Sequence, residues 1–311
     1  MSKLAAPLRV PIFRALWIAN IGSNFGSLVQ AVGAAWLMTL ISESDTLVAL
    51  VQASTTLPIM AFSLISGAVA DGYDRRRVML FSQLFMLVSS AALTAFTFLG
   101  MINAWMLLGF TFLIGAGMAF HNPAWQASVR DFVGKDLVPS AVLLNGVGFN
   151  VTRSVAPAIG GSIVAAVGAV AAFVINTLSY LGLIAAVWSW EGPPRSETGQ
   201  RERLRSAIGA GLRYVSLSPH LMRIYSRGFV FGLSNVVVLA LLPLVARDSL
   251  QGDSLTFGLL LGGFGLGAVI GGLSSARVSQ HLSNEQMIRL SFLMFAVAAV
   301  IFSVSQWLVL T

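Results

Sequence analysis

The sequence has 311 residues, of which 56% are hydrophobic and only 10% are charged, and it contains no cysteine. Ordinary globular domains carry roughly 25% charged residues, so a chain this poor in charge lacks the polar surface that a water-soluble protein needs. The absence of cysteine excludes a disulfide framework, a thiolate metal site and cysteine catalysis. We therefore expect a membrane protein whose apolar segments are helices, because hydrocarbon satisfies no backbone hydrogen bond.

The apolar runs predict an all-α membrane protein with nine transmembrane helices. Each run is long enough to cross the bilayer core, which takes about 20 residues of helix. The expected bounds, in chain order, are residues 14–41, 47–70, 78–100, 104–127, 140–167, 169–190, 221–245, 255–275 and 287–309.

The formal net charge is +7, and the basic residues behind it are distributed unevenly. Of the 19 Lys and Arg residues, all but Arg153 and Arg247 fall on one side of the predicted helices, in loops or at the adjoining helix ends. The positive-inside rule places that side in the cytoplasm. We therefore expect a multi-pass protein of the bacterial cytoplasmic membrane with a cytoplasmic amino terminus, whose basic loops contact lipid headgroups rather than nucleic acid.

Polar residues form a stripe on the first predicted helix. Asn20, Ser23, Asn24, Ser27 and Gln30 fall within an arc of about 120° when successive residues are turned by ~100°. The stripe predicts a surface that faces a substrate cavity, with Asn20, Asn24 and Gln30 as candidate contacts. The alternative is that these groups hydrogen-bond to neighbouring helices, which is common for Ser and Asn in membranes.

A charged turn separates the second and third predicted helices. Its carboxylates and guanidinium groups cannot lie in hydrocarbon, so they mark where the chain leaves the bilayer and enters it again. A glycine shortly before the turn lets two helices approach closely. The residues concerned are Gly67, Asp71, Asp74, Arg75, Arg76 and Arg77.

The fifth predicted helix places a cation near mid-membrane. Gly146, Asn150, Arg153, Pro157 and Gly160 share a face about 80° wide. A buried guanidinium is costly unless it is paired, and no Asp or Glu lies in the apolar body of any predicted helix. Asn150 and Arg153 are therefore candidate residues for substrate binding or gating. The alternative is a structural arginine braced by backbone carbonyls.

Residues 191–218 form the longest polar stretch and divide the chain into two units. The first unit, 1–190, holds six predicted helices, and the second, 219–311, holds three. Apolar residues at helical spacing predict an interfacial amphipathic helix from about 201 to 218 within the stretch. The alternative is a flexible charged linker.

Glycines follow both sides of the eighth predicted helix. Small residues at this spacing let helix backbones touch, so both sides are expected to pack tightly. One side carries Gly258, Gly262, Gly265 and Gly272, and the other carries Gly263, Gly267 and Gly271. No strand precedes these glycines, which excludes a dinucleotide-binding loop.

Several of these motifs resemble the major facilitator superfamily. The residues Gly67, Asp71 and Arg75 to Arg77 are similar to its signature after the second helix: a glycine, an aspartate four residues later, and then a basic cluster. Asp74 before the arginines looks like the branch that includes enterobactin exporters and transmembrane secretion effectors. The fifth helix adds a motif similar to the Gly-Pro-x-x-Gly-Gly signature of the superfamily's exporters, formed here by Ala156, Pro157, Gly160 and Gly161.

The resemblance implies a bundle of twelve helices that works by alternating access around a central cavity, with the last three helices missing here. It implies that Asp71 and the arginines of the turn latch the cytoplasmic gate, that proton antiport drives the transport, and that a partner chain could supply the missing helices.

We therefore expect an exporter of a small molecule, with the lipid bilayer and protons as its other partners. The alternatives are a non-transporting membrane assembly or sensor protein and an inactive transporter fragment. An enzyme, a cofactor and a metal site are not expected, because the sequence shows no metal-ligand cluster, nucleophile elbow or paired carboxylates.

Overall fold

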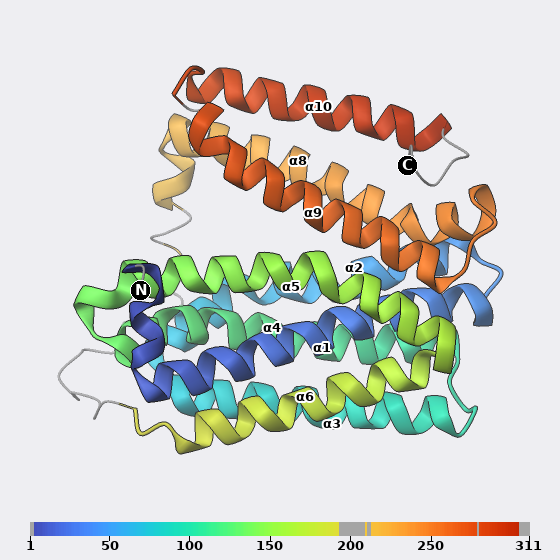
Figure 1. The fold of residues 1–311 in the computed structure, drawn as a ribbon, viewed down its shortest axis with the longest axis horizontal. Coiled ribbons are helices and arrows are strands. Elements are labelled where there is room, and N and C mark those ends of the chain that lie inside the picture. The colour runs from blue at the N-terminus through green and yellow to red at the C-terminus, as the bar shows by residue number, and fades with distance from the viewer. Residues whose placement is uncertain (1–2, 193–208, 210–212, 279, 305–311) are drawn as a thin grey trace.

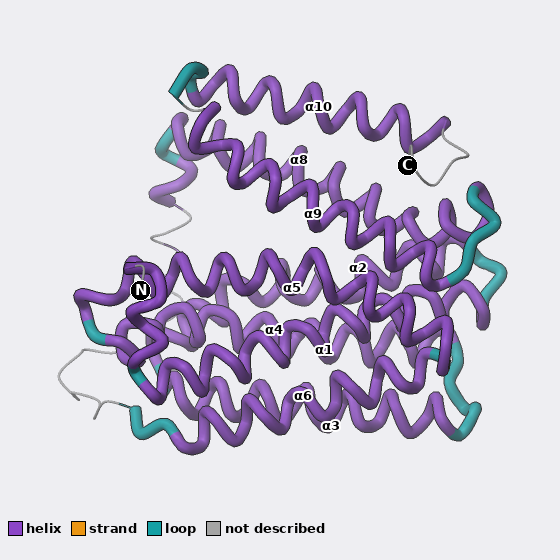
Figure 2. Tube along the Cα trace, in the orientation of Figure 1, coloured by secondary structure: helices purple, strands orange, loops and turns teal. Residues whose placement is uncertain are grey.

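The computed structural model describes residues 3–192, 209, 213–278 and 280–304. Within these residues the chain forms nine long α-helices and no strand, so the predicted all-α fold is confirmed (Figures 1 and 2). Three short helical segments, η1 (Lys3–Arg9), η2 (Lys135–Leu137) and η3 (Val245–Ser249), adjoin them. The long helices are α1 (Pro11–Ile41), α2 (Asp45–Gly72), α3 (Arg75–Phe98), α4 (Ala104–Val133), α5 (Val138–Val167), α6 (Ala169–Ser189), α8 (Pro219–Leu244), α9 (Ser254–Val278) and α10 (Asn284–Val304).

Eight of these helices are long and apolar enough to cross a membrane by length and composition, among the residues that the structure describes. The remaining one, α5, is not among the eight and contains Asn145, Asn150 and Arg153. It nevertheless lies within the bundle alongside the eight. A helix that is both central and polar is a position where a membrane protein can bind a solute.

Capping side chains set where some helices begin. Asp74 accepts a hydrogen bond from the backbone N–H of Arg77 at 3.2 Å, and Asp253 accepts one from that of Thr256 at 3.0 Å. These bonds satisfy N–H groups that have no partner inside the helix, and those at Asp253 hold the pKa of its carboxyl below the ordinary value. Because the cap at Asp74, rather than the apolar run, sets the first residue of the helix, α3 starts at Arg75, ahead of the predicted residue 78.

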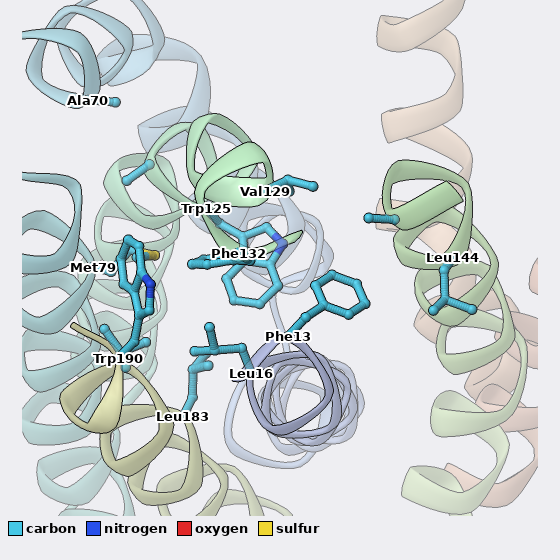
Figure 3. Close-up of a cluster of buried hydrophobic side chains, with 13 residues drawn as sticks. Phe13, Leu16, Ala70, Met79, Trp125, Val129, Phe132, Leu144, Leu183 and Trp190 are labelled. Carbon is cyan, nitrogen blue, oxygen red and sulfur yellow. The ribbon is translucent and has the colours of Figure 1, made fainter. Parts of the chain in front are cut away.

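Helices α1 to α6 form one bundle, in which α1 packs on α5 and α6, and α4 packs on α2 and α3 (Figure 1). Its core is aromatic near the end that holds the amino terminus (Figure 3). There the rings of Phe132 and Trp190 meet edge to face with centroids 4.8 Å apart, and Trp125 lies 5.3 Å from Phe132. Phe13 and Leu16 of α1 are fully buried in the same cluster. This packing joins α1, α4 and α6 firmly at that end.

Helices α8, α9 and α10 lie beside this bundle as a second group (Figure 1). α9 packs along α5, and α8 contacts α2. α10 is joined to α8 by an ion pair between Arg227 and Glu285 at 2.6 Å, and the ring of Phe231 lies between those of Phe292 and Phe295. Most of the predicted linker, 191–218, including most of its expected amphipathic helix, lies outside the described residues, although residues 213–216 are helical.

Candidate functional site

The two groups of helices touch where α5 crosses α9, and glycine forms this contact. A Cβ atom on Gly161 would lie 2.5 Å from the carbonyl oxygen of Ser254, and one on Gly258 would lie 2.5 Å from that of Pro157. A Cβ on Gly265 would lie 2.6 Å from the carbonyl oxygen of Arg153. Real Cβ contacts are not this short, so only glycine allows the two backbones to meet. The predicted tight packing of Gly258, Gly262 and Gly265 is confirmed.

The predicted functional face of α5 is divided by this crossing. Pro157 and Gly160, at one end of the face, are buried, and a Cβ on Gly160 would lie 3.1 Å from the backbone of Val29 on α1. Toward the other end, Asn150 is exposed and Gly146 has no heavy atom within 4 Å of a Cβ position. The same face therefore packs between helices at one end and is open at the other.

α9 shows the same division. Beyond the crossing, Gly267, Gly271 and Gly272 have no neighbour within 4 Å of a Cβ position, and neither has Gly263. The prediction that both glycine rows pack tightly is therefore wrong for the second row and for Gly272. In Figure 1, α9 meets the bundle far from the amino terminus and diverges from it toward the end where the amino terminus lies.

We call the end with the α5–α9 crossing the closed end and the end with the α2–α3 turn the open end. The closed end also carries an ion pair between the two groups, because Arg247 lies 3.2 Å from Asp45 at the start of α2 and 2.6 Å from Asp248. In the sequence, Arg247 stands out only as the basic residue on the opposite side of the predicted helices. The adjacent Asp248 was the local signal that could have indicated an ion pair.

Arg153 lies where the closed and open parts of α5 meet. Its guanidinium is 5.3 Å from the centroid of the Phe264 ring on α9, and the residue is half-buried. Among the described residues it forms no ion pair and no side-chain hydrogen bond. Asn150, one turn toward the open end, donates from Nδ2 to the carbonyl oxygen of Gly146 at 2.8 Å. A half-buried cation next to an open face, with an aromatic ring as its neighbour, can receive an anionic group.

The polar stripe of α1 separates into two parts. Gln30 is buried, and its Oε1 accepts hydrogen bonds from Asn176 Nδ2 at 2.6 Å and from Ser90 Oγ at 2.9 Å. It therefore joins α1 to α3 and α6, as the hydrogen-bonding alternative describes. Asn20 and Asn24 are half-buried and form no side-chain hydrogen bond with any described residue.

Replacing Gln30 with leucine is expected to destabilise the bundle by about 1–2 kcal/mol, the usual worth of such interhelical hydrogen bonds in membranes. Ser90 and Asn176 would each lose a buried acceptor. Thermal unfolding in detergent measures the change. Asn24→Leu is the matched control because Asn24 forms no such bond, and equal shifts in the two variants would refute the assignment.

The charged turn contains two kinds of residue. Arg75 Nη1 donates to the carbonyl oxygen of Ala127 at 3.0 Å and lies 3.1 Å from Asp131 Oδ2, and Arg76 donates to the carbonyl oxygens of Val187 and Trp188. With the cap by Asp74, these bonds fasten the turn to the ends of α4 and α6. Asp71, by contrast, is exposed and has no hydrogen bond or ion pair within the part of the chain that the structure describes. Gly67 has no heavy atom within 4 Å of a Cβ position.

The exporter-like motif of α5 lies at the closed end. Ala156 is fully buried in a core cluster with residues of α1 and α6, and Gly160 and Gly161 touch α1 and α9 respectively. The motif therefore fits α5 between two helices that belong to different groups. The structure thus brings this motif and Arg153 together along one helix, whereas the charged turn lies at the opposite end.

The known proteins that this chain resembles are membrane transporters and a family of secretion proteins. The family model described as "Transmembrane secretion effector" matches residues 2–311. The chain is 23% identical to the staphyloferrin A transporter of Staphylococcus aureus, over 92% of this chain and 70% of that protein. It is 26% identical to the multidrug efflux pump Tap of Mycolicibacterium fortuitum, over 90% and 69%, and 26% identical to the enterobactin exporter EntS of Shigella boydii, over 91% and 67%.

A solved structure shares the fold. It is that of a bacterial homologue of the human lysosomal transporter Spinster, in an inward-facing and unoccupied conformation. The TM-score is 0.68 at 16% sequence identity, and the match covers 98% of this chain and 71% of that one.

Proposed function

Because the chain belongs to the transmembrane secretion effector family of the major facilitator superfamily, we propose that it exports a small, negatively charged molecule by alternating access. Membership of this family makes it a multi-pass bacterial membrane transporter and not an enzyme. The efflux and secretion proteins among its relatives support the direction of transport. The charge of the substrate rests on Arg153 alone.

Arg153 supports an anionic substrate because nothing else among the described residues balances its charge. Phe264 stabilises the guanidinium through its ring face but leaves the N–H donors free for a carboxylate or a similar group. Asn20, Asn24 and Asn150 supply further donors and acceptors on α1 and α5. In this proposal Gln30 contributes indirectly, by holding α1 in place.

The conformation supports alternating access between two orientations of the helix groups. In the present state the groups meet at the closed end and separate at the open end. By the positive-inside rule the open end, with Arg75 to Arg77, faces the cytoplasm, so a substrate could reach Arg153 from that side. Export then requires the α5–α9 crossing to part while the open end closes.

We propose that the turn between α2 and α3 forms contacts across the open end in the other state, in which the open end is closed. Asp74, Arg75 and Arg76 brace the turn within the first bundle, which keeps its shape constant during the motion. Asp71 has no partner among the described residues in the present state and is available for a contact formed only when the open end closes. Coupling to inward proton flow is proposed from the family alone.

A transport assay in inverted membrane vesicles tests the function. On imposing an acidic lumen, we expect accumulation of small carboxylate-bearing compounds, such as siderophore-like chelators, and collapse of that accumulation on adding a protonophore. Uncharged drug-like compounds of similar size serve as the comparison. Equal accumulation of charged and uncharged compounds would refute the substrate assignment, and no accumulation of either would refute export.

Replacing Arg247 with glutamine is expected to weaken the closed end modestly. Partly exposed ion pairs contribute about 0.2–1 kcal/mol, so the balance of states should shift by about fivefold or less. The chain has no cysteine, so Ser254→Cys gives a single reporter at a buried position of the crossing, and its labelling rate by a maleimide measures opening.

Arg223→Gln is the matched control, because Arg223 is an exposed arginine of α8, the helix before η3, and donates to its own helix backbone. Adding Asp45→Asn to the Arg247 variant should produce little further opening. Fully additive effects of the two substitutions would show that the pair does not act as one contact.

A further inference from the structure

A groove lies between α2 and α3, with α4 as its floor. The two helices each pack along α4 but scarcely touch one another, which leaves a space of about 780 Å³ between them. The α2–α3 turn forms one end of the groove, at Tyr73 and Arg77. The groove is separate from the α5–α9 crossing and from the surroundings of Arg153.

The walls of the groove are apolar along most of their length. Phe81 and Phe85 line it from α3, and Phe120 lines it from α4, where its ring lies 5.8 Å from that of Phe62 on α2. Phe81 is 73% exposed. Gly117 lines the floor, and a Cβ there would run into the side chain of Met86, so glycine lets α3 and α4 pack closely at this point. These residues lie in helices that cross the bilayer, so the groove has the dimensions and the chemistry to hold an acyl chain.

The end of the groove at the turn is lined by one cation, Arg77, and one carboxylate, Asp74. Arg75 and Arg76 are engaged with the ends of α4 and α6, whereas the side chain of Arg77 is 87% exposed. Its nearest carboxylate, that of Asp74, lies 3.9 Å away and already caps α3. Tyr73, half exposed beside it, adds a hydroxyl donor. Arginine and tyrosine at a helix end are placed where lipid phosphates lie.

We propose that this groove binds one acidic phospholipid. Its phosphate group lies between the guanidinium of Arg77 and the hydroxyl of Tyr73, and one acyl chain lies over Phe81, Phe85 and Phe120. An acidic lipid is preferred over a zwitterionic one because the latter brings its own ammonium group next to Arg77. Any lipid can fill an apolar groove, so the selectivity for the headgroup is what distinguishes this site.

Native mass spectrometry of the detergent-purified chain, with equal amounts of phosphatidylglycerol and phosphatidylcholine of the same acyl chains, tests the proposal. We expect the wild-type protein to retain phosphatidylglycerol preferentially. Arg77→Gln should lower that retention about fivefold, the effect of one arginine near an anionic headgroup. Phe85→Ala should lower the retention of both lipids, because it removes part of the apolar wall.

Arg14→Gln is the matched control, because Arg14 is an exposed arginine at the same end of the molecule that does not line the groove. Its retention of phosphatidylglycerol should equal that of the wild type. Equal losses in the Arg77 and Arg14 variants would overturn the site. Equal retention of the two lipids by the wild-type protein would also overturn it, and that comparison requires no variant to fold.

Discussion

Replacing Gly258 with leucine is expected to abolish export and to hold the closed end apart. A Cβ atom there would lie 2.5 Å from the carbonyl oxygen of Pro157 and 2.8 Å from the Cα of Gly161, and a backbone cannot yield as a side chain can. Overpacking of this kind typically costs about 1–3 kcal/mol. A free energy of that size changes the balance between two states by roughly 5- to 150-fold.

Gly263→Leu provides the control for this experiment. The substitution is the same and lies on the same helix, but no heavy atom lies within 4 Å of a Cβ at Gly263. With Ser254→Cys as reporter, maleimide labelling should accelerate in the Gly258 variant and stay unchanged in the Gly263 variant. If the Gly258 variant is labelled as slowly as its parent and still transports, the crossing is not a gate.

Replacing Arg153 with glutamine is expected to remove transport of carboxylate-bearing compounds while the protein still folds. Removing one partner of a buried charge pair, such as Arg153 would form with a bound carboxylate, costs about 2–5 kcal/mol. The lower figure already corresponds to a loss of about thirtyfold in apparent affinity. Concentration dependence of uptake in the inverted vesicles measures this effect. Arg153→Lys keeps the charge and should retain part of the activity.

The thermal stability and the substrate range of the Arg153→Gln variant distinguish substrate binding from a structural role for Arg153. Phe264→Leu is the companion variant, because it removes the aromatic ring beside the guanidinium but leaves the charge in place. If Arg153 were only a structural brace, its glutamine variant would lower thermal stability and would affect charged and uncharged substrates alike. Selective loss of charged substrates with unchanged stability would support the binding role.

The periodicity of the sequence was sufficient to predict the helices and the composition of their faces. Gly146, Asn150, Arg153, Pro157 and Gly160 share a face because helical geometry depends only on local spacing. The point at which that face changes from packed to open could not be predicted. It depends on where α9 crosses α5, and no local pattern encodes the position of a crossing.

Contacts between distant residues account for the other differences. Gln30 and Asn176 are 146 positions apart, so a stripe on α1 could not reveal whether its members face a cavity or another helix. Arg247 and Asp45 are 202 positions apart and meet only because two groups of helices come together. The prediction of tight packing for the second glycine row of α9 was wrong for the same reason, because a small residue allows close packing but does not supply the neighbouring helix.

Backbone contact at the closed end has a consequence for how this end opens. Glycine has no side-chain rotamers, so parting or rejoining α5 and α9 at the crossing itself changes little side-chain freedom. The other contacts at this end do involve side chains: Arg247 pairs with Asp45, and Val32 packs in a buried cluster with Leu242 and Phe257. We therefore expect the side-chain rearrangement that accompanies opening to be concentrated at these residues rather than along the α5–α9 crossing.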